Sequence, residues 1–409
     1  MNGEIGGSMG LWILSTHLIE GRITPGDFGV LFPDHIMGHD VTAPPALEML
    51  DRSGVPLLRA ARKTTLYLDH FTPPKDAESA EVCRSMIEFM GRYGGKSVVN
   101  WGEGICHVHM FEEGRVRPGD LVLGADSHIT TGGAIGAYCI AVGSTDLAVA
   151  MASGEFWMQI PDPLGILLDG SPDVWCEGKD LALKMLSALG PVNASGRLLE
   201  IGGDILNFLG EDGRMTIANM ASESSCSSAM IETGTDYGPR SKEWHWDTEH
   251  IDCTDMGPQI ALPGSPDTVD DVLNHLGKKV DQVFVGSCTN GRLDDLRVLS
   301  DILKGKKVHA DVRLLVIPGS RHVYASAVKA GYIRTIIDAG GIVSMPTCGP
   351  CAGGFLGVLP AGEVAVSTTN RNFRGRMGDP TSKVYLSGVA VAGASAVTGV
   401  ISHPEEVVH

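Results

Sequence analysis

The sequence has few basic residues for its length. Its 409 residues include 32 Lys and Arg against 49 Asp and Glu, a formal net charge of −17. Because proteins that bind nucleic acids gain most of their affinity by neutralising phosphates with Lys and Arg, this deficit argues against a nucleic-acid partner. A small anionic substrate remains compatible, since a few arginines can reverse the local potential inside a cleft.

Long apolar runs are also missing. No segment reaches the ~18 apolar residues of a membrane span, and the opening MNGEIGGSMG lacks the basic and apolar regions of a signal peptide. We therefore expect a cytoplasmic protein with no membrane partner. In a reducing compartment, nine cysteines favour metal binding or catalysis over disulfides. Six of them lie singly and are expected to be small buried hydrophobes: Cys83, Cys106, Cys139, Cys176, Cys226 and Cys253.

The length and the order of the apolar segments predict an α/β protein with more than one domain. A chain of 409 residues exceeds the size at which one hydrophobic core stops growing. From about residue 281, short apolar runs alternate with helical periodicity, which predicts parallel strands joined by right-handed crossovers. The Ala- and Gly-rich stretch 134–153 is expected to form one small-residue helix. The turn-rich Pro263-Gly264-Ser265-Pro266 is interpreted as a linker. The expected domains are residues 1–162, 163–275 and 276–409.

A CxxC motif, Cys348-Gly349-Pro350-Cys351, follows a predicted strand over 341–345, and a third cysteine, Cys288, follows another over 283–285. Ligands in parallel sheets bind at the carboxyl ends of strands, so the two loops can converge on one crevice. Two thiolates at this spacing can hold an iron-sulfur cluster or zinc, or form a redox pair. A structural zinc site wants four ligands, and the sequence has no second CxxC. The three alternatives stay open on this motif alone.

Three further strand ends carry histidine, and two of these pair it with aspartate. One histidine alone is more often a structural group than a catalyst. Aspartate beside histidine keeps the imidazole protonated or oriented, which suits proton delivery to a leaving hydroxyl. The loops are Asp69-His70 after 66–68, Gly104-Ile105-Cys106-His107 after 98–101, and Asp126-Ser127-His128 after 121–123.

A basic segment, 370–376, follows a predicted strand over 364–367. Its arginines could bind carboxylates through paired hydrogen bonds. A solvated basic turn is the alternative, and the position at another strand end favours the functional interpretation.

Taken together, these motifs resemble the aconitase superfamily, most closely the large subunits of its 3-isopropylmalate dehydratase and homoaconitase branch. The resemblance covers nearly the whole chain. It is carried by Ile13-Leu14-x-x-His17-Leu18, Gly124-x-Asp126-Ser127-His128-x-Thr130, Ser265-Pro266-Asp267, Gly286-Ser287-Cys288-Thr289-Asn290, Cys348-Gly349-Pro350-Cys351 and Asn370-Arg371-Asn372-Phe373-x-Gly375-Arg376. The resemblance implies three α/β/α domains around a central cluster cleft, and a hydro-lyase that dehydrates and rehydrates a 2-hydroxy di- or tricarboxylic acid.

The resemblance also implies a role for each matched residue. Cys288, Cys348 and Cys351 correspond to the three ligands of a 4Fe-4S cluster whose fourth iron acts as a Lewis acid. Asp69 and His70 resemble the acid pair that protonates the departing hydroxyl. The expected proton and water network consists of His107, Asp126 and His128, and Glu223 corresponds to the family's cluster-side catalytic carboxylate from the middle domain. The expected substrate-binding residues are Ser127, Arg371, Arg376, Asn290 and Asn219.

Two departures from the family pattern narrow this expectation. Pro44 and Pro45 follow Asp40-Val41-Thr42-Ala43, where full-length relatives place a glutamine nearby, and this favours the dehydratase branch. The family's catalytic base is a serine in a swivelling fourth domain that also supplies an arginine, and no segment here matches it. We therefore expect a separate small subunit to supply both residues. The alternative of a different class is an RNA-binding regulator derived from the same fold, against which the charge argues.

Overall fold

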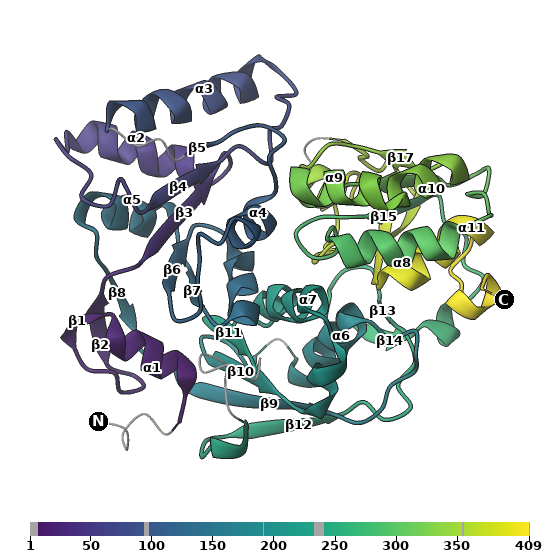
Figure 1. The fold of residues 1–409 in the computed structure, drawn as a ribbon, viewed down its shortest axis with the longest axis horizontal. Helices are drawn as coiled ribbons and strands as arrows, with labels where there is room; N and C mark the ends of the chain where they lie inside the picture. The colour runs from purple at the N-terminus through teal and green to yellow at the C-terminus, as the bar shows by residue number, and fades with distance from the viewer. Residues whose placement is uncertain (1–6, 94–97, 191, 233–240, 354–355, 409) are drawn as a thin grey trace.

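The computed structural model describes residues 7–93, 98–190, 192–232, 241–353 and 356–408 and arranges them around four β-sheets (Figure 1). Its strands are β1 (Leu18–Gly21), β2 (Phe28–Leu31), β3 (His35–His39), β4 (Thr64–Tyr67), β5 (Val98–Val99), β6 (Leu121–Gly124), β7 (Tyr138–Ala141), β8 (Phe156–Gln159), β9 (Pro163–Asp169), β10 (Leu198–Gly202), β11 (Ser228–Ile231), β12 (Thr248–Asp252), β13 (Gln259–Ala261), β14 (Val269–Asp271), β15 (Gln282–Val285), β16 (Arg313–Val316), β17 (Ile342–Val343), β18 (Val364–Ser367) and β19 (Lys383–Ser387).

The helices alternate with these strands along the chain. The α-helices are α1 (Met9–Thr16), α2 (Ala43–Ser53), α3 (Ala77–Arg92), α4 (Cys106–Glu112), α5 (Ser144–Ser153), α6 (Gly178–Leu189), α7 (Glu211–Ala221), α8 (Leu293–Leu303), α9 (Arg321–Ala330), α10 (Tyr332–Ala339) and α11 (Val389–Thr398). The site also uses the 3-10 helices η1 (Ser127–Ile135), η3 (Ser222–Ser224) and η6 (Gly349–Ala352). Among the described residues, none of these helices has the length and apolar character needed to cross a membrane.

The first large sheet is parallel, in the order β5-β4-β3-β6-β7, and is buried on both faces. Ile36 and Leu66 point into one core, where α2, α3 and α5 pack. Their neighbours Met37 and Tyr67 point into a second core, which continues into the next sheet. Burial of both faces is usual for parallel sheets covered by helices, and it leaves the strand ends as the place for polar groups. A small antiparallel sheet, β1-β2-β8, lies beside it.

The second sheet, β11-β10-β9-β12, is also parallel and packs against α6 and α7. Helix α7 contacts η1 of the first sheet region on one side and α8 of the third on the other. In Figure 1 it accordingly lies in the middle of the molecule. Residues of α7 and the following η3 therefore reach the space between the first and third sheets.

The third sheet has the order β14-β13-β19-β18-β15-β16-β17, and helices α8 to α11 pack around it. Its five strands from β19 to β17 are parallel, as the sequence predicts, while β13 and β14 are antiparallel additions. The α/β class is confirmed. Residues 263–266, interpreted above as a linker, form the turn between β13 and β14 within this sheet. The division into domains at 162 and 275 stays a prediction.

One predicted element is wrong. The small-residue stretch 134–153 was expected to be a single helix, but Tyr138–Ala141 forms β7 beside β6, and only Ser144–Ser153 is helical. Gly136 has φ +83°, a left-handed conformation that ends the preceding 3-10 helix. Helix and strand are hard to distinguish in short segments of small apolar residues, because periodicity is weak there.

Candidate active site

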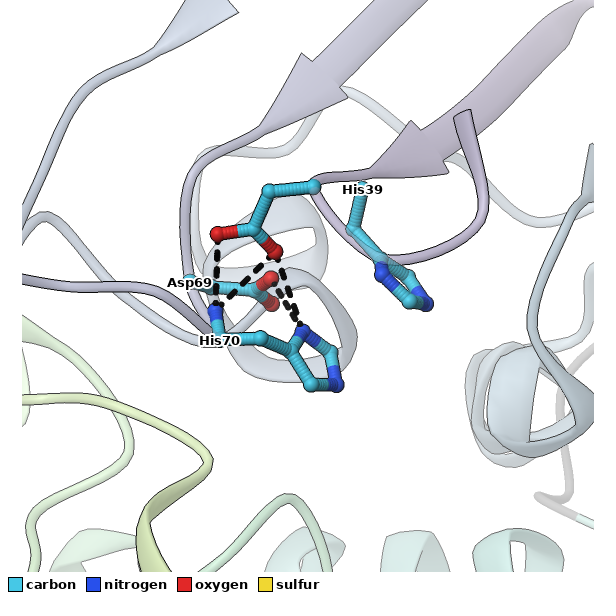
Figure 2. A group of neighbouring side chains, drawn as sticks. His39, Asp69 and His70 are labelled. Atoms are coloured by element: carbon cyan, nitrogen blue, oxygen red, sulfur yellow. Dashed lines mark hydrogen bonds and ion pairs between the residues drawn. The ribbon is translucent and has the colours of Figure 1, made fainter. Parts of the chain in front are cut away.

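The predicted acid pair lies at the carboxyl end of β4. Asp69 is 1% exposed, and its Oδ1 is 2.8 Å from Nδ1 of His70, while its Oδ2 accepts a hydrogen bond of 2.8 Å from the backbone N–H of Cys106. Figure 2 shows the two side chains facing each other at this strand end. Burial alone would lower the pKa of His70, but the charge of Asp69 and the hydrogen bond to Asp40 outweigh it and raise that pKa well above its usual value. His70 is therefore a protonated, partly accessible acid.

Two residues that the sequence analysis did not select complete this group. Asp40 is 1% exposed, accepts 3.2 and 2.7 Å hydrogen bonds from the backbone N–H groups of His70 and Phe71, and lies 3.4 Å from Nδ1 of His70. His39 stacks on His70 with ring centroids 4.2 Å apart. Both residues are labelled in Figure 2. His39 is the last residue of β3, the neighbour of β4, and Asp40 directly follows it. Asp69 and His70 were selected because they directly follow a predicted strand. The same criterion would have selected His39 and Asp40 if β3 had been predicted.

Asp126, after β6, connects the acid group to the rest of the site. Its Oδ2 is 3.1 Å from Nε2 of His39, and its Oδ1 is 2.7 Å from Nε2 of His107 and accepts 2.8 Å from the backbone N–H of His128. Burial would raise the pKa of Asp126, but its histidine partners hold it well below the usual value. Asp126 is therefore a partly buried carboxylate shared by three histidines.

The network continues across the molecule to the third sheet. Nε2 of His128 is 2.8 Å from Oε1 of Glu223 in η3, and Oε2 of Glu223 accepts a 3.0 Å hydrogen bond from Nε of Arg371. Nη2 of Arg371 donates 2.8 Å to Oγ of Ser127. Segments from all three large sheet regions thus meet in one polar cluster. Five predicted residues, Asp126, Ser127, His128, Glu223 and Arg371, are brought together in it.

Two of the buried histidines around Asp126, His128 and His107, differ in protonation. Burial opposes the charge on His128, but hydrogen bonds to Asp126 and Glu223 raise its pKa to about 9. Burial lowers the pKa of His107, and its single close carboxylate does not reverse this. Nδ1 of His107 is buried with no hydrogen-bond partner in the described part of the chain. At neutral pH, His128 is charged and His107 is neutral, so one orients anions and the other can exchange a proton.

The three predicted ligand cysteines lie buried beside this network. Cys288, Cys348 and Cys351 are 5%, 8% and 3% exposed, and all three thiols are free. A hydrogen bond from Cys348 lowers the pKa of Cys351 to about 6 against burial, helped by the charges of Arg376, His128 and His70. The surroundings therefore favour at least one thiolate, the form that binds metals.

Two asparagines hold the cysteine sulfurs in place. Nδ2 of Asn219, on α7, donates 3.3 Å to Sγ of Cys288, and Nδ2 of Asn370 donates 3.4 Å to the same atom. Sγ of Cys351 lies 3.5 Å from Oδ1 of Asn370. Asn219 was predicted to bind substrate, and here its amide contacts Cys288 together with Thr131 and Asn370. Asn370, which links two cysteines, was not selected as a site residue, although it stands directly before Arg371.

The three thiols do not all lie close enough together to share a single zinc ion. In the described residues, the group of His, Cys, Asp and Glu close enough to share one ion consists of His39, Asp40, Asp69 and His70, and the cysteines form no group of three whose sulfurs all lie within 4.8 Å. Zinc–sulfur bonds are about 2.3 Å long, so three thiolates on one zinc would lie closer together. The donor set of three buried free cysteines fits a 4Fe-4S cluster, whose ligands are thiolates.

The remaining two predicted residues lie at different edges of the site. Arg376 acts electrostatically on Cys351, and its Nε is buried with no hydrogen-bond partner among the described residues. Asn290 donates 2.9 Å through Nδ2 to Oδ1 of Asp295 and 3.4 Å to Oγ1 of Thr216, so its amide faces the α7–α8 side. Arg376 has a free donor for a ligand, whereas the amide nitrogen of Asn290 is already engaged.

Comparison with solved structures agrees with this architecture. The structure aligns with the crystal structure of Thermococcus kodakaraensis aconitase X in its holo form with a TM-score of 0.53 and 13% identity, covering 86% of this chain and 88% of that one. The chain therefore has the aconitase fold, in which strand ends of several α/β units surround one cleft.

Sequence comparison carries the assignment further. The model of the aconitase family (aconitate hydratase) matches residues 12–237 and 271–399. Curated relatives include the 3-isopropylmalate dehydratase large subunits of Desulfitobacterium hafniense (43% identical, 97% of this chain and 98% of that protein) and Moorella thermoacetica (44%, 97% and 98%). The large subunit 1 of Pyrococcus abyssi is 42% identical over 97% of this chain and 98% of its own length. The chain belongs to the aconitase family and is a hydro-lyase.

Proposed function

We propose that this chain is the large subunit of a 3-isopropylmalate dehydratase. The observation that carries the proposal is identity of 42–44% with large subunits of that name over 97% of the chain. The continuous network from His70 to Arg371 supports it, because dehydration of a hydroxy acid needs both a proton donor and groups that bind carboxylates.

Cys288, Cys348 and Cys351 would hold a 4Fe-4S cluster in this enzyme. When bound, the cluster supplies an iron without a protein ligand that polarises the substrate's C–O bond as a Lewis acid. Asn219 and Asn370 donate hydrogen bonds toward Sγ of Cys288, and such donors tune and stabilise thiolate ligands. The chain itself therefore supplies the ligands and their supporting contacts.

His70 is the proposed proton donor. Its pKa is raised by Asp69 and Asp40, so it carries a proton at neutral pH, and its side chain is 15% exposed. Asp69 orients the ring through Nδ1, which leaves Nε2–H to face a leaving hydroxyl. His107 and Asp126 would relay and hold water in the same network.

Arg371 and Arg376 are the proposed carboxylate-binding groups. Arg371 is positioned by Glu223 and Ser127, and Arg376 has an Nε with no partner among the described residues. A guanidinium group binds a carboxylate through two parallel hydrogen bonds. The two arginines would orient a dicarboxylate between the acid group and the cysteines. Asn290 and Asn219 remain predicted substrate-binding residues at the edge of the site.

A small partner subunit would complete the site. The relatives are named large subunits, which supports a heteromer. The partner would supply the serine base and an arginine. The test is to purify the chain alone and together with its small subunit, and to follow turnover of 3-isopropylmalate anaerobically. Only the complex of the two subunits is expected to turn over the substrate. Robust turnover by the isolated chain would refute the division of the site between two polypeptides.

A further inference from the structure

A fully buried lysine contacts the main chain just before Asn370 and has no role in the proposed chemistry. Lys179, near the start of α6, is 0% exposed. Its Nζ donates hydrogen bonds of 2.8 Å and 2.7 Å to the main-chain oxygens of Thr368 and Thr369. Lysine is rarely buried without a charged or polar partner, since removing an ammonium group from water is costly. The complete burial of Lys179 therefore calls for a structural or functional explanation.

The two carbonyl groups belong to the strand end that carries site residues. Thr368 and Thr369 directly follow β18 and precede Asn370 and Arg371. Asn370 contacts both Cys288 and Cys351, and Arg371 binds Glu223. Lys179 thus connects a helix of the second sheet region to the third-sheet loop on which these contacts depend.

The charges that face the ammonium group are negative. Asp295 and Asp180 act on Lys179, and so do Cys288 and Cys351 when ionised. Burial lowers the pKa of Lys179 to about 7, although these anions favour its charged form and oppose that shift. Three thiolates and their cluster would add to the negative charge that acts on Lys179, so a buried cation there is electrostatically matched to an occupied site.

We infer that Lys179 is a positioning residue for the cluster site, which fixes the 368–371 loop and supplies a buried positive charge close to the cysteine ligands. This inference rests on the proposed function, because it concerns the cluster that Cys288, Cys348 and Cys351 would hold. Net charge and hydrogen bonding around the ligands set the reduction potential of iron-sulfur clusters. Lys179 should therefore affect the potential and not just the stability of the chain.

The experiment compares substitutions that separate charge from contact. Lys179→Met removes both, Lys179→Gln removes the charge but keeps N–H donors, and Lys179→Arg keeps the charge. Lys184→Met, on the same helix but only partly buried, is the matched control. Each anaerobically reconstituted chain is assayed for iron and sulfide, for the midpoint potential of its cluster by a dithionite titration followed by electron paramagnetic resonance, and for iron loss to a chelator.

Lys179→Met and Lys179→Gln should move the midpoint to more negative values, because an added electron loses a favourable charge, while Lys179→Arg and Lys184→Met stay close to the unmodified chain. Lys179→Met should also retain iron about 10- to 100-fold less tightly, the usual cost of losing a supporting contact around a metal ligand. A midpoint unchanged in Lys179→Met and Lys179→Gln would overturn the inference.

Two further outcomes are decisive. If neither uncharged variant yields a folded, cluster-bearing chain, Asp295→Asn makes the same test with the opposite sign. It removes a negative charge that faces Lys179, so the midpoint should become more positive, and an unchanged midpoint overturns the inference. An unmodified chain that binds neither iron nor sulfide refutes the proposed function together with this inference. A cluster whose midpoint potential does not change when Lys179 is replaced refutes the inference alone.

Discussion

The backbone N–H of Cys348 donates a 3.0 Å hydrogen bond to the main-chain oxygen of Asp69. The same oxygen accepts a second bond of 3.0 Å from Oγ1 of Thr347. The strand end that carries the acid pair and the loop that begins the CxxC motif are therefore fixed to each other. The proton donor and the predicted cluster ligands come from different sheets, yet this contact sets their relative position without relying on side-chain packing alone.

Asp40→Asn should lower kcat by about 10- to 100-fold, a part of the ~10²–10⁴-fold that a positioned acid contributes. Asp40 accepts hydrogen bonds from two backbone N–H groups and helps keep His70 protonated. Steady-state kinetics of the assembled enzyme measure the effect. Asp51→Asn, which removes a surface carboxylate paired with Arg92, is the control and should leave kcat unchanged. Equal kcat values for the two variants would show that Asp40 does not contribute to catalysis.

His39→Phe should lower kcat by about 10-fold or more with little change in KM. Phenylalanine keeps a ring to stack on His70 but cannot donate to Asp126, and a hydrogen bond to a charged group contributes about 1.5–3 kcal/mol. His35→Phe is a matched control on the same strand, since His35 also pairs with an aspartate, Asp120. A His39→Phe enzyme as active as the His35→Phe enzyme would show that the link to Asp126 is dispensable.

The pH dependence of the chain's stability should reveal the positive charge on His128. Its folded-state pKa of about 9 lies above the ordinary value of 6.5, so its stabilising contribution is complete below about pH 6.5 and is lost as pH rises through about 9. The melting temperature of the metal-free chain is compared with that of His128→Asn between pH 6 and 10. The advantage of the unmodified chain should shrink steadily over this range. A difference that stays constant with pH would contradict a charged His128.

Gly133→Ala should destabilise the chain by at least about 1–3 kcal/mol, the usual cost of overpacking. A Cβ on Gly133 would lie 1.7 Å from the main-chain oxygen of Ala229, at the junction of η1 and β11. Gly91→Ala is the control, because a Cβ there meets nothing within 4 Å and alanine favours the helix by about 0.5–1 kcal/mol. Thermal unfolding of both variants decides, and a Gly133→Ala chain as stable as the control would disprove the close junction.

Much of the site was predictable because parallel sheets place functional groups at strand ends. The apolar runs before Asp69, Asp126 and Cys288 identify their strands directly. His39 and Asp40 were missed because β3 contains Gly38 and two histidines and does not look apolar. Gly38 is there for space, since a Cβ would lie 3.1–3.2 Å from the side chains of Ala43, Leu147 and Leu66.

Other features depend on contacts between distant segments and could not be predicted from local pattern. Lys179 looks like an ordinary helix residue in the sequence, and its burial follows from where α6 meets the loop after β18. Asn370 gains its role from lying between two cysteines. The turn at 263–266 has the composition of a linker, and only pairing of β13 with β14 and β19 shows that it lies within a sheet.

The central claim is that Cys288, Cys348 and Cys351 together hold one 4Fe-4S cluster. The most direct measurement is the iron and acid-labile sulfide content of the anaerobically purified chain, with its visible absorbance, for the unmodified protein, Cys348→Ser and the control Cys253→Ser, which alters a buried cysteine outside the site. Broad cluster absorbance is expected in the unmodified protein and in Cys253→Ser, and it should be lost in Cys348→Ser. Cluster absorbance unchanged in Cys348→Ser would contradict a cluster held by these three cysteines.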